Sequence, residues 1–168
     1  MSFTRDLIKK VVNKCVFSSD KVQVVVAPIA LHLGEALRTI NKDVIICAQN
    51  CSLTGTGAFT GEISVEHLKD FGINWTLTGH SERRAMFGET SKIVAGKTKR
   101  AIDLKMEVIA CIGEQLADRE AGKTFEVVSE QLGAINDVLT AADWAHVAIA
   151  YEPVWAIGTG LSASAAQA

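Results

Sequence analysis

The 168-residue sequence lacks the features that mark several large classes of protein. Its formal net charge is only −2, and no basic stretch is interleaved with aromatic residues, so we expect no nucleic-acid partner. Its longest apolar runs, such as residues 24–27 and 44–48, are strand-sized and far short of the ~20 residues of a membrane span. Residues 1–10 are charged and contain no apolar stretch typical of a secretory signal. We therefore expect no membrane association and a cytoplasmic location.

Cysteine is scarce as well, with four residues at positions 15, 47, 51 and 111. That is too few for a disulfide scaffold, so we expect reduced thiols in a cytosol-like compartment. The hydrophobic content of 48% excludes intrinsic disorder. Together with a charged content of 21%, it is typical of one globular domain covering residues 1–168.

Apolar periodicity alternates between helix and strand along the chain. It predicts helices over residues 4–17 and 31–40, after Ser64, after Thr90 or Ser91 and around 125–135, and strands over 22–27, 44–49, 75–79, 107–112 and 146–151. Such alternation predicts an α/β fold with a parallel sheet. The strands begin about 31 residues apart, as in a doubly wound five-stranded sheet and in part of a (β/α)8 barrel of ~250 residues. Periodicity leaves both architectures open.

Polar residues follow the carboxyl ends of these strands, the edge that carries the sites of parallel α/β proteins. They are Gln49, Asn50, His80, Ser81, Glu82, Glu114 and Glu152. At His80 a helix is expected to follow, and a backbone N–H directed at the ring would keep the imidazole neutral, so that it could donate a hydrogen bond as an electrophile. The alternative is a structural histidine paired with Glu82. For the histidines at positions 32, 67 and 146 we expect surface or packing roles.

Glu152 directly follows an apolar strand, residues 148–151, and a carboxylate in that position is partly desolvated, which suits it to act as a general base. The segment 153–160 is unusually apolar for an exposed loop. Gly158 and Gly160 allow close backbone approach there, so we expect a lid whose amides could hold an anion. The alternative for Glu152 is a surface glutamate in a salt bridge.

The sequence motifs do not indicate a cofactor or a metal. Residues 55–61 follow the pattern G-x-G-x-x-x-G, which is one residue longer than the dinucleotide fingerprint and begins too far beyond its strand. Cys47 and Cys51 lack the second ligand pair of a zinc site. Cys111 lies in an apolar strand, where we expect a buried packing thiol. We expect no cofactor and no metal.

Five segments, in the same order along the chain, resemble the triosephosphate isomerase family: AQNC at 48–51, GAFTGEIS at 57–64, GHSERR at 79–84, VIACIGE at 108–114 and AYEPVWAIGTG at 150–160. The resemblance implies an incomplete TIM barrel of about five βα units, equivalent to the second to sixth strands of the family. It also implies interconversion of dihydroxyacetone phosphate and D-glyceraldehyde 3-phosphate through an enediol, in glycolysis and gluconeogenesis, without a cofactor.

The same resemblance implies the roles of individual residues. Glu152 corresponds to the catalytic base and His80 to the electrophile, and Gly158 corresponds to a backbone contact with the substrate phosphate. Glu82 and Ser81 correspond to residues that support the site. Thr60 lies in the segment that resembles the family's dimer loop, so the resemblance implies a homodimer that acts on a small phosphorylated three-carbon substrate.

The sequence also departs from the family pattern. It contains neither the Asn-x-Lys segment of the family's first strand nor its later phosphate-binding strands, and residues 161–166 lack the usual Lys and Pro. Losing one electrostatic stabiliser typically lowers a rate by ~10²-fold or more. We therefore expect little activity from these 168 residues alone, with exposed strand edges and poor packing. The alternative function is a non-catalytic fragment that associates with intact subunits.

Overall fold

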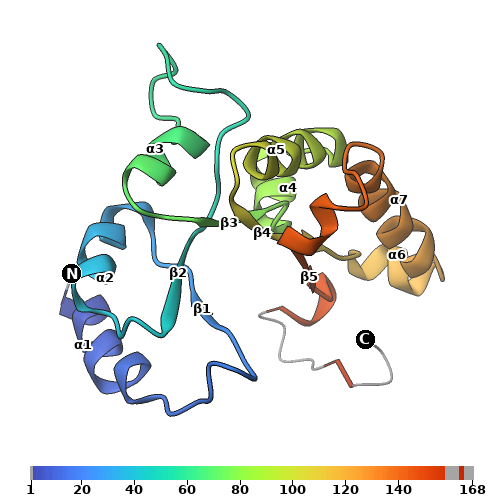
Figure 1. Ribbon diagram of the computed structural model, residues 1–168. Coiled ribbons are helices and arrows are strands. Elements are labelled where there is room, and N and C mark those ends of the chain that lie inside the picture. Colours follow the sequence, from blue (N-terminus) through green and yellow to red (C-terminus); the bar gives the residue numbers. More distant parts are fainter. Residues whose placement is uncertain (1, 158–162, 165–168) are drawn as a thin grey trace.

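Five parallel strands form one curled sheet in the computed structural model, which describes residues 2–157 and 163–164 (Figure 1). The strands are β1 (Val24–Val26), β2 (Val44–Ala48), β3 (Trp75–Thr78), β4 (Glu107–Ile112) and β5 (Val147–Tyr151). Their order in the sheet follows their order in the chain. A doubly wound sheet reverses its strand order part-way. The observed order therefore rules out that alternative and confirms the incomplete TIM barrel.

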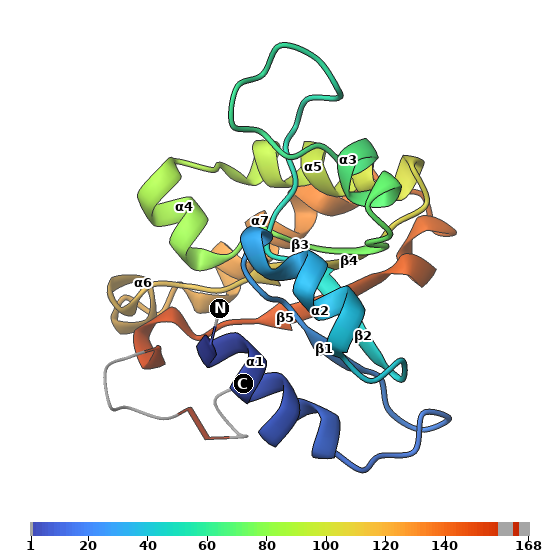
Figure 2. The ribbon, with the colours of Figure 1, turned by 90° about the vertical axis from the view of Figure 1, so that its left-hand side faces the viewer.

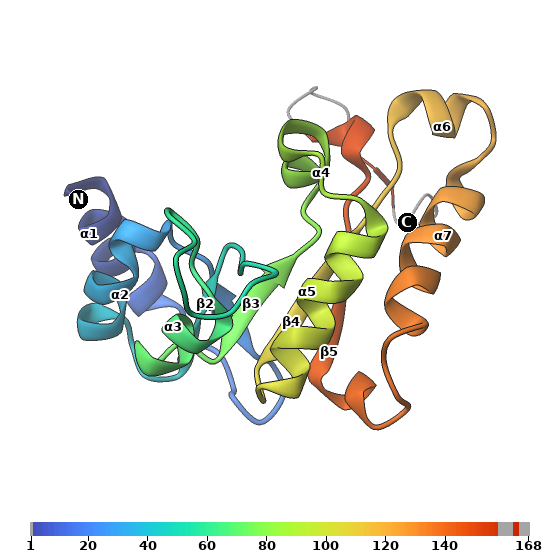
Figure 3. The ribbon, with the colours of Figure 1, turned by 90° about the horizontal axis from the view of Figure 1, so that it is seen from above.

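The connections between the strands contain most of the helices, as the βαβ pattern predicts. The α-helices are α1 (Ser2–Lys10), α2 (Leu33–Thr39), α3 (Val65–Asp70), α4 (Ser81–Phe87), α5 (Ser91–Asp103), α6 (Leu116–Glu120) and α7 (Thr124–Asn136). Short 3-10 turns are η1 (Val12–Lys14), η2 (Ala30–His32), η3 (Asp143–His146) and η4 (Val154–Ala156). Helix α5 packs against β3, β4 and α7, and α2 packs against β2 (Figure 3).

The hydrophobic core lies between the sheet and these helices. In β4, Val108 and Ala110 are fully buried in a cluster that includes Val94 of α5 and Ile135 of α7. The alternate residue Ile109 is only half-buried, because side chains of a strand point to opposite faces of the sheet. The helix-covered face of the sheet is therefore the well-packed one.

The first helix is shorter than predicted. Helix α1 ends at Lys10, and Val11 leaves the helical conformation with φ −122° and ψ −71°. Beyond it, the side chain of Asn13 donates to the Thr39 carbonyl and accepts from the Asn41 N–H, both at 2.8 Å. These bonds anchor the chain to the end of α2. The prediction of a helix to residue 17 is wrong because those tertiary bonds replace the last helical turns.

Two helix starts agree with the prediction. The Ser64 hydroxyl accepts from the His67 N–H, and His67 Nδ1 accepts from the Ser64 N–H, which forms a capping box. Thr90 caps α5 by accepting from the Ile93 N–H at 3.3 Å.

Between β2 and α3, the loop of residues 50–63 projects away from the sheet and its helices (Figure 2). In residues 2–157 and 163–164, no helix is both long and apolar enough to span a membrane.

Candidate active site

His80 and Glu152 extend from the carboxyl ends of β3 and β5, which flank β4 in the sheet. Gly79 makes the turn out of β3 with φ +71°, a conformation that L side chains rarely adopt. A Cβ atom there would also lie 2.7 Å from Val94 Cγ1 and 3.0 Å from the Cys111 carbonyl oxygen. Glycine at this position therefore allows His80 to begin α4 directly after the strand.

The two side chains contact each other. His80 Nε2 lies 3.0 Å from Glu152 Oε1, and the Ser81 N–H donates to Glu152 Oε2 at 3.0 Å. Both carboxylate oxygens thus have a partner, and the Glu152 side chain is only 17% exposed. The carboxylate is held by α4 although it comes from the end of β5.

The N-terminus of α4 fixes the tautomer of His80. His80 Nδ1 accepts a hydrogen bond from the Glu82 N–H at 3.3 Å, so Nε2 is the ring nitrogen that carries a proton, and it faces Glu152. The Glu82 carboxylate is 3.8 Å from Nδ1, and its side chain is 75% exposed. Pairing of His80 with the Glu82 carboxylate, the structural alternative, is therefore the weaker contact. Glu82 acts on the ring through its backbone.

Glu114, at the end of β4, holds the chain on both sides of Glu152. It is fully buried, and its carboxylate accepts from the Tyr151 hydroxyl at 3.0 Å, from Trp155 Nε1 at 3.0 Å and from Arg119 at 3.2 Å. Burial alone would raise the pKa of Glu114, but hydrogen bonds from its own backbone and these side chains outweigh burial and hold the pKa below its usual range. The Arg119 guanidinium also stacks 4.4 Å from the Trp155 ring centroid.

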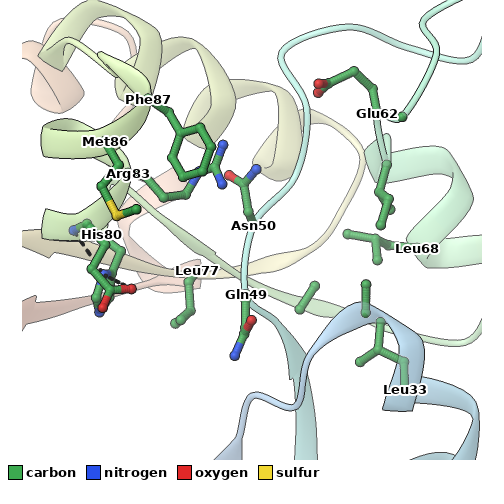
Figure 4. Close-up of a pocket in the computed structure, with 15 residues that line it drawn as sticks. Leu33, Gln49, Asn50, Glu62, Leu68, Leu77, His80, Arg83, Met86 and Phe87 are labelled. Carbon is green, nitrogen blue, oxygen red and sulfur yellow. Dashed lines mark hydrogen bonds and ion pairs between the residues drawn. The ribbon is translucent and has the colours of Figure 1, made fainter.

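A cleft of about 530 Å³ opens beside His80. In Figure 4, Arg83, Met86 and Phe87 border it together with His80, Leu33 and Leu68 lie across from them, and Gln49 and Asn50 lie between. The cleft reaches His80 and Glu82, but Glu152 is not among its lining residues. Of the two paired side chains, His80 lines this cleft and Glu152 does not.

Behind the cleft lies a buried ionic cluster that the sequence analysis missed. Glu89 accepts from Lys97 and from Arg83, both at 2.6 Å, and Lys97 also donates to Asn50 at 2.9 Å. The cluster ties the loop after β2 to α4 and α5. The sequence does contain a sign of a buried charge, because the charged residue Lys97 lies on the same helical stripe as the apolar residues Val94 and Ala101.

The other predicted site residues have different places. Ser81 joins the site through its backbone N–H, as described above. Thr60 is exposed in the loop of residues 50–63. Gly158 lies outside the described residues, so its predicted phosphate contact stays a prediction. Within the part of the chain that the structure describes, no three His, Cys, Asp or Glu side chains gather as a metal site would require.

Together, the curled parallel sheet and a histidine-bonded carboxylate at its strand ends define a barrel-type α/β protein with a candidate proton-transfer site. A sequence model of the triosephosphate isomerase family matches residues 1–168. The chain belongs to the triosephosphate isomerase family.

Curated relatives agree with this assignment. The triosephosphate isomerase of Emericella nidulans is 52% identical over 147 residues, which are 88% of this chain and 59% of the relative. That of Debaryomyces hansenii is 46% identical, covering 98% of this chain and 66% of the relative. A chloroplastic triosephosphate isomerase from Fragaria ananassa is 48% identical over a region that is 98% of this chain and 52% of the relative. The chain thus spans roughly half to two thirds of the length of these relatives.

Proposed function

We propose that this protein interconverts dihydroxyacetone phosphate and D-glyceraldehyde 3-phosphate, as a step of glycolysis and gluconeogenesis. The observation that carries the proposal is the contact of the Glu152 carboxylate with the Nε2 of a histidine whose other ring nitrogen accepts from a helix N-terminus. A neutral imidazole in that position is an arrangement for which triosephosphate isomerase is itself the standard example.

The reaction needs two groups that this pair can supply. Glu152 removes a proton from the carbon next to the carbonyl, and the Nε2–H of His80 donates to the carbonyl oxygen as it gains negative charge. The carbonyl oxygen takes the Nε2 proton to form the enediol, the ring recovers a proton from the neighbouring hydroxyl, and the carbon proton returns to the former carbonyl carbon, so the two carbons exchange oxidation states. The balance closes without an external oxidant or reductant, and we propose that no cofactor takes part.

Substrate binding requires the Glu152 carboxylate to move. It bonds to His80 and to the Ser81 N–H, so it must release Nε2 before that donor can bind a carbonyl oxygen. Trp155 and Tyr151, both bonded to Glu114, hold the chain on either side of Glu152 while this happens. We propose that Gly158 contributes a backbone contact to the substrate phosphate, and that Ser81 and Glu82 support the site through their N–H groups.

We also propose that residues 1–168 are part of a single TIM-barrel domain, and that the protein is a cytoplasmic homodimer whose subunits meet through the loop that contains Thr60. Apolar side chains in this loop support the interface, since Phe59 and Ile63 are partly exposed there. The four free cysteines fit a reducing compartment such as the cytoplasm.

Proton exchange tests the proposed reaction. Incubation with dihydroxyacetone phosphate in D₂O should place deuterium on the carbon that Glu152 deprotonates, and slow turnover suffices because exchange accumulates over hours. Glu152→Gln should lower the rate by about 10²–10⁴-fold, the usual contribution of a general base. The exposed Glu126, replaced by Gln, is the matched control. A chain that catalyses no exchange contradicts the proposal and favours the non-catalytic alternative, which native mass spectrometry with a full-length relative would test.

A further inference from the structure

Gln131 of α7 is buried in a way that its side-chain type does not favour. It is only 7% exposed, whereas glutamines are mostly exposed in proteins. Its amide makes two bonds to one backbone unit: the Gly113 N–H donates to Gln131 Oε1 at 2.9 Å, and Gln131 Nε2 donates to the Gly113 carbonyl at 3.0 Å. The side chain therefore pairs with Gly113 as a neighbouring strand would.

Gly113 in turn lies against the backbone of Glu152. A Cβ atom at position 113 would overlap the Glu152 carbonyl oxygen and lie 2.8 Å from its carbonyl carbon. One residue earlier, the Ile112 carbonyl accepts from the Glu152 N–H at 2.7 Å. Close packing of this kind transmits displacements, because little free space is left to absorb them. A shift of Gly113 would move the Glu152 backbone and with it the carboxylate.

We propose that Gln131 is a positioning residue for the Glu152 carboxylate, acting through Gly113. Its expected effect on catalysis rests on the proposed function, whereas its effect on the contact between Glu152 and His80 does not. Gln131 touches neither of these side chains by the bonds described, so its influence passes through the Gly113 backbone.

Position 131 requires a side-chain amide of glutamine length to bond to both backbone groups of Gly113. A methionine in its place would leave the N–H and the carbonyl of Gly113 without side-chain partners, and unpaired buried polar groups are costly. A glutamate would present a second acceptor to the Gly113 carbonyl. An asparagine keeps the amide but is one methylene too short to reach both backbone groups from α7.

The test compares the full chain with Gln131→Met and Gln131→Asn, the second variant being the milder one. Ile135→Ala is the matched control, because Ile135 is buried one turn further along α7 and packs in the hydrophobic core. The first readout is the nuclear magnetic resonance signal of the His80 Nε2–H, which reports its bond to Glu152. The second readout is the measurement of kcat and KM for dihydroxyacetone phosphate, which shows which of the two constants each variant changes.

We expect both Gln131 variants to shift or broaden the His80 signal, whereas Ile135→Ala lowers the Tm and leaves that signal in place. Displacing a reacting group by about 1 Å can cost about 10²-fold, so kcat should fall by up to that factor with KM little changed. An unchanged His80 signal in Gln131→Asn, or an equal shift in Ile135→Ala, would overturn the proposal. If the unaltered chain shows no turnover, the proposed function fails while the His80 signal still decides the role of Gln131.

Discussion

Lys97 and Glu89 form an ion pair of 2.6 Å in which both side chains are only 6% exposed. Burial raises the pKa of Glu89, but the hydrogen bonds from Lys97 and Arg83 outweigh it and hold the pKa below its ordinary value. Breaking a buried pair typically costs about 3–5 kcal/mol, and because Lys97→Met leaves Glu89 with Arg83 as its remaining charged partner, the lower end of that range applies. We expect Lys97→Met to lower the free energy of unfolding by that order, as measured by urea denaturation at pH 7.

Two further variants make this prediction specific. Lys99 pairs with Asp103 on the exposed side of the same helix, so Lys99→Met should change stability little. The double variant Glu89→Gln/Lys97→Met removes both buried charges and leaves only Arg83, whose side chain is 29% exposed, so it should be more stable than Lys97→Met alone. The prediction is wrong if Lys97→Met and Lys99→Met unfold at the same urea concentration.

The close approach of Gly113 to Glu152 predicts that even the smallest side chain is not tolerated there. Gly113→Ala must push two backbone segments apart, and overpacking of this kind costs about 1–3 kcal/mol or more. Gly133, in the last turn of α7, has open space where a Cβ atom would lie, so Gly133→Ala should stabilise the protein by up to about 0.5–1 kcal/mol through helix propensity. Thermal unfolding of the two variants should therefore shift in opposite directions, and a stabilising Gly113→Ala would contradict the observed packing.

Much of the fold could be predicted from local patterns. Apolar periodicity places all five strands to within about two residues, because apolar runs such as Val24–Val26, which is half-buried, and Val44–Ala48 form strands of a parallel sheet. Periodicity gives the number of βα units but not the order of the strands in the sheet. Strand order depends on which distant strands pair, so only the structure distinguishes a doubly wound sheet from a barrel. The end of α1 was missed for the same reason, since Asn13 bonds to Thr39 at the end of α2 and to Asn41 beyond it.

The site could be predicted only in part. The position of polar residues after strands identified His80 and Glu152, and the structure brings these two together at 3.0 Å. Gln131 was not identified, because a buried amide is recognisable only once its partner Gly113, far away in the sequence, is known. Phe125, an apolar residue of the helix predicted around residues 125–135, is 83% exposed. Local sequence patterns therefore do not identify polar side chains whose hydrogen-bond partners are distant backbone groups.

Acid stability should depend on Glu35 of α2. Hydrogen bonds from Arg5 and Arg38 lower its pKa from 4.5 to about 2. A carboxyl group with a depressed folded-state pKa contributes stability above its unfolded pKa and loses it as the pH falls through the folded value. Glu35→Gln should therefore be less stable than the unaltered chain at pH 7, and the difference should shrink between pH 4.5 and 2. Urea unfolding across that range checks this, and a difference that stays constant with pH would contradict it.

Thiol reactivity should separate Cys15 from the other three cysteines. Desolvation by burial raises the pKa of Cys47 and of Cys111 to about 12 and that of Cys51 to about 11, and the thiolate is the reactive form. Cys15 is exposed, so iodoacetamide at pH 8 should label the native chain there and label all four positions in urea. Peptide mass spectrometry locates the label, and Cys15→Ser should abolish native labelling. Labelling of Cys111 as fast as Cys15 would mean that the end of β4, next to Gly113 and Glu152, opens to solvent.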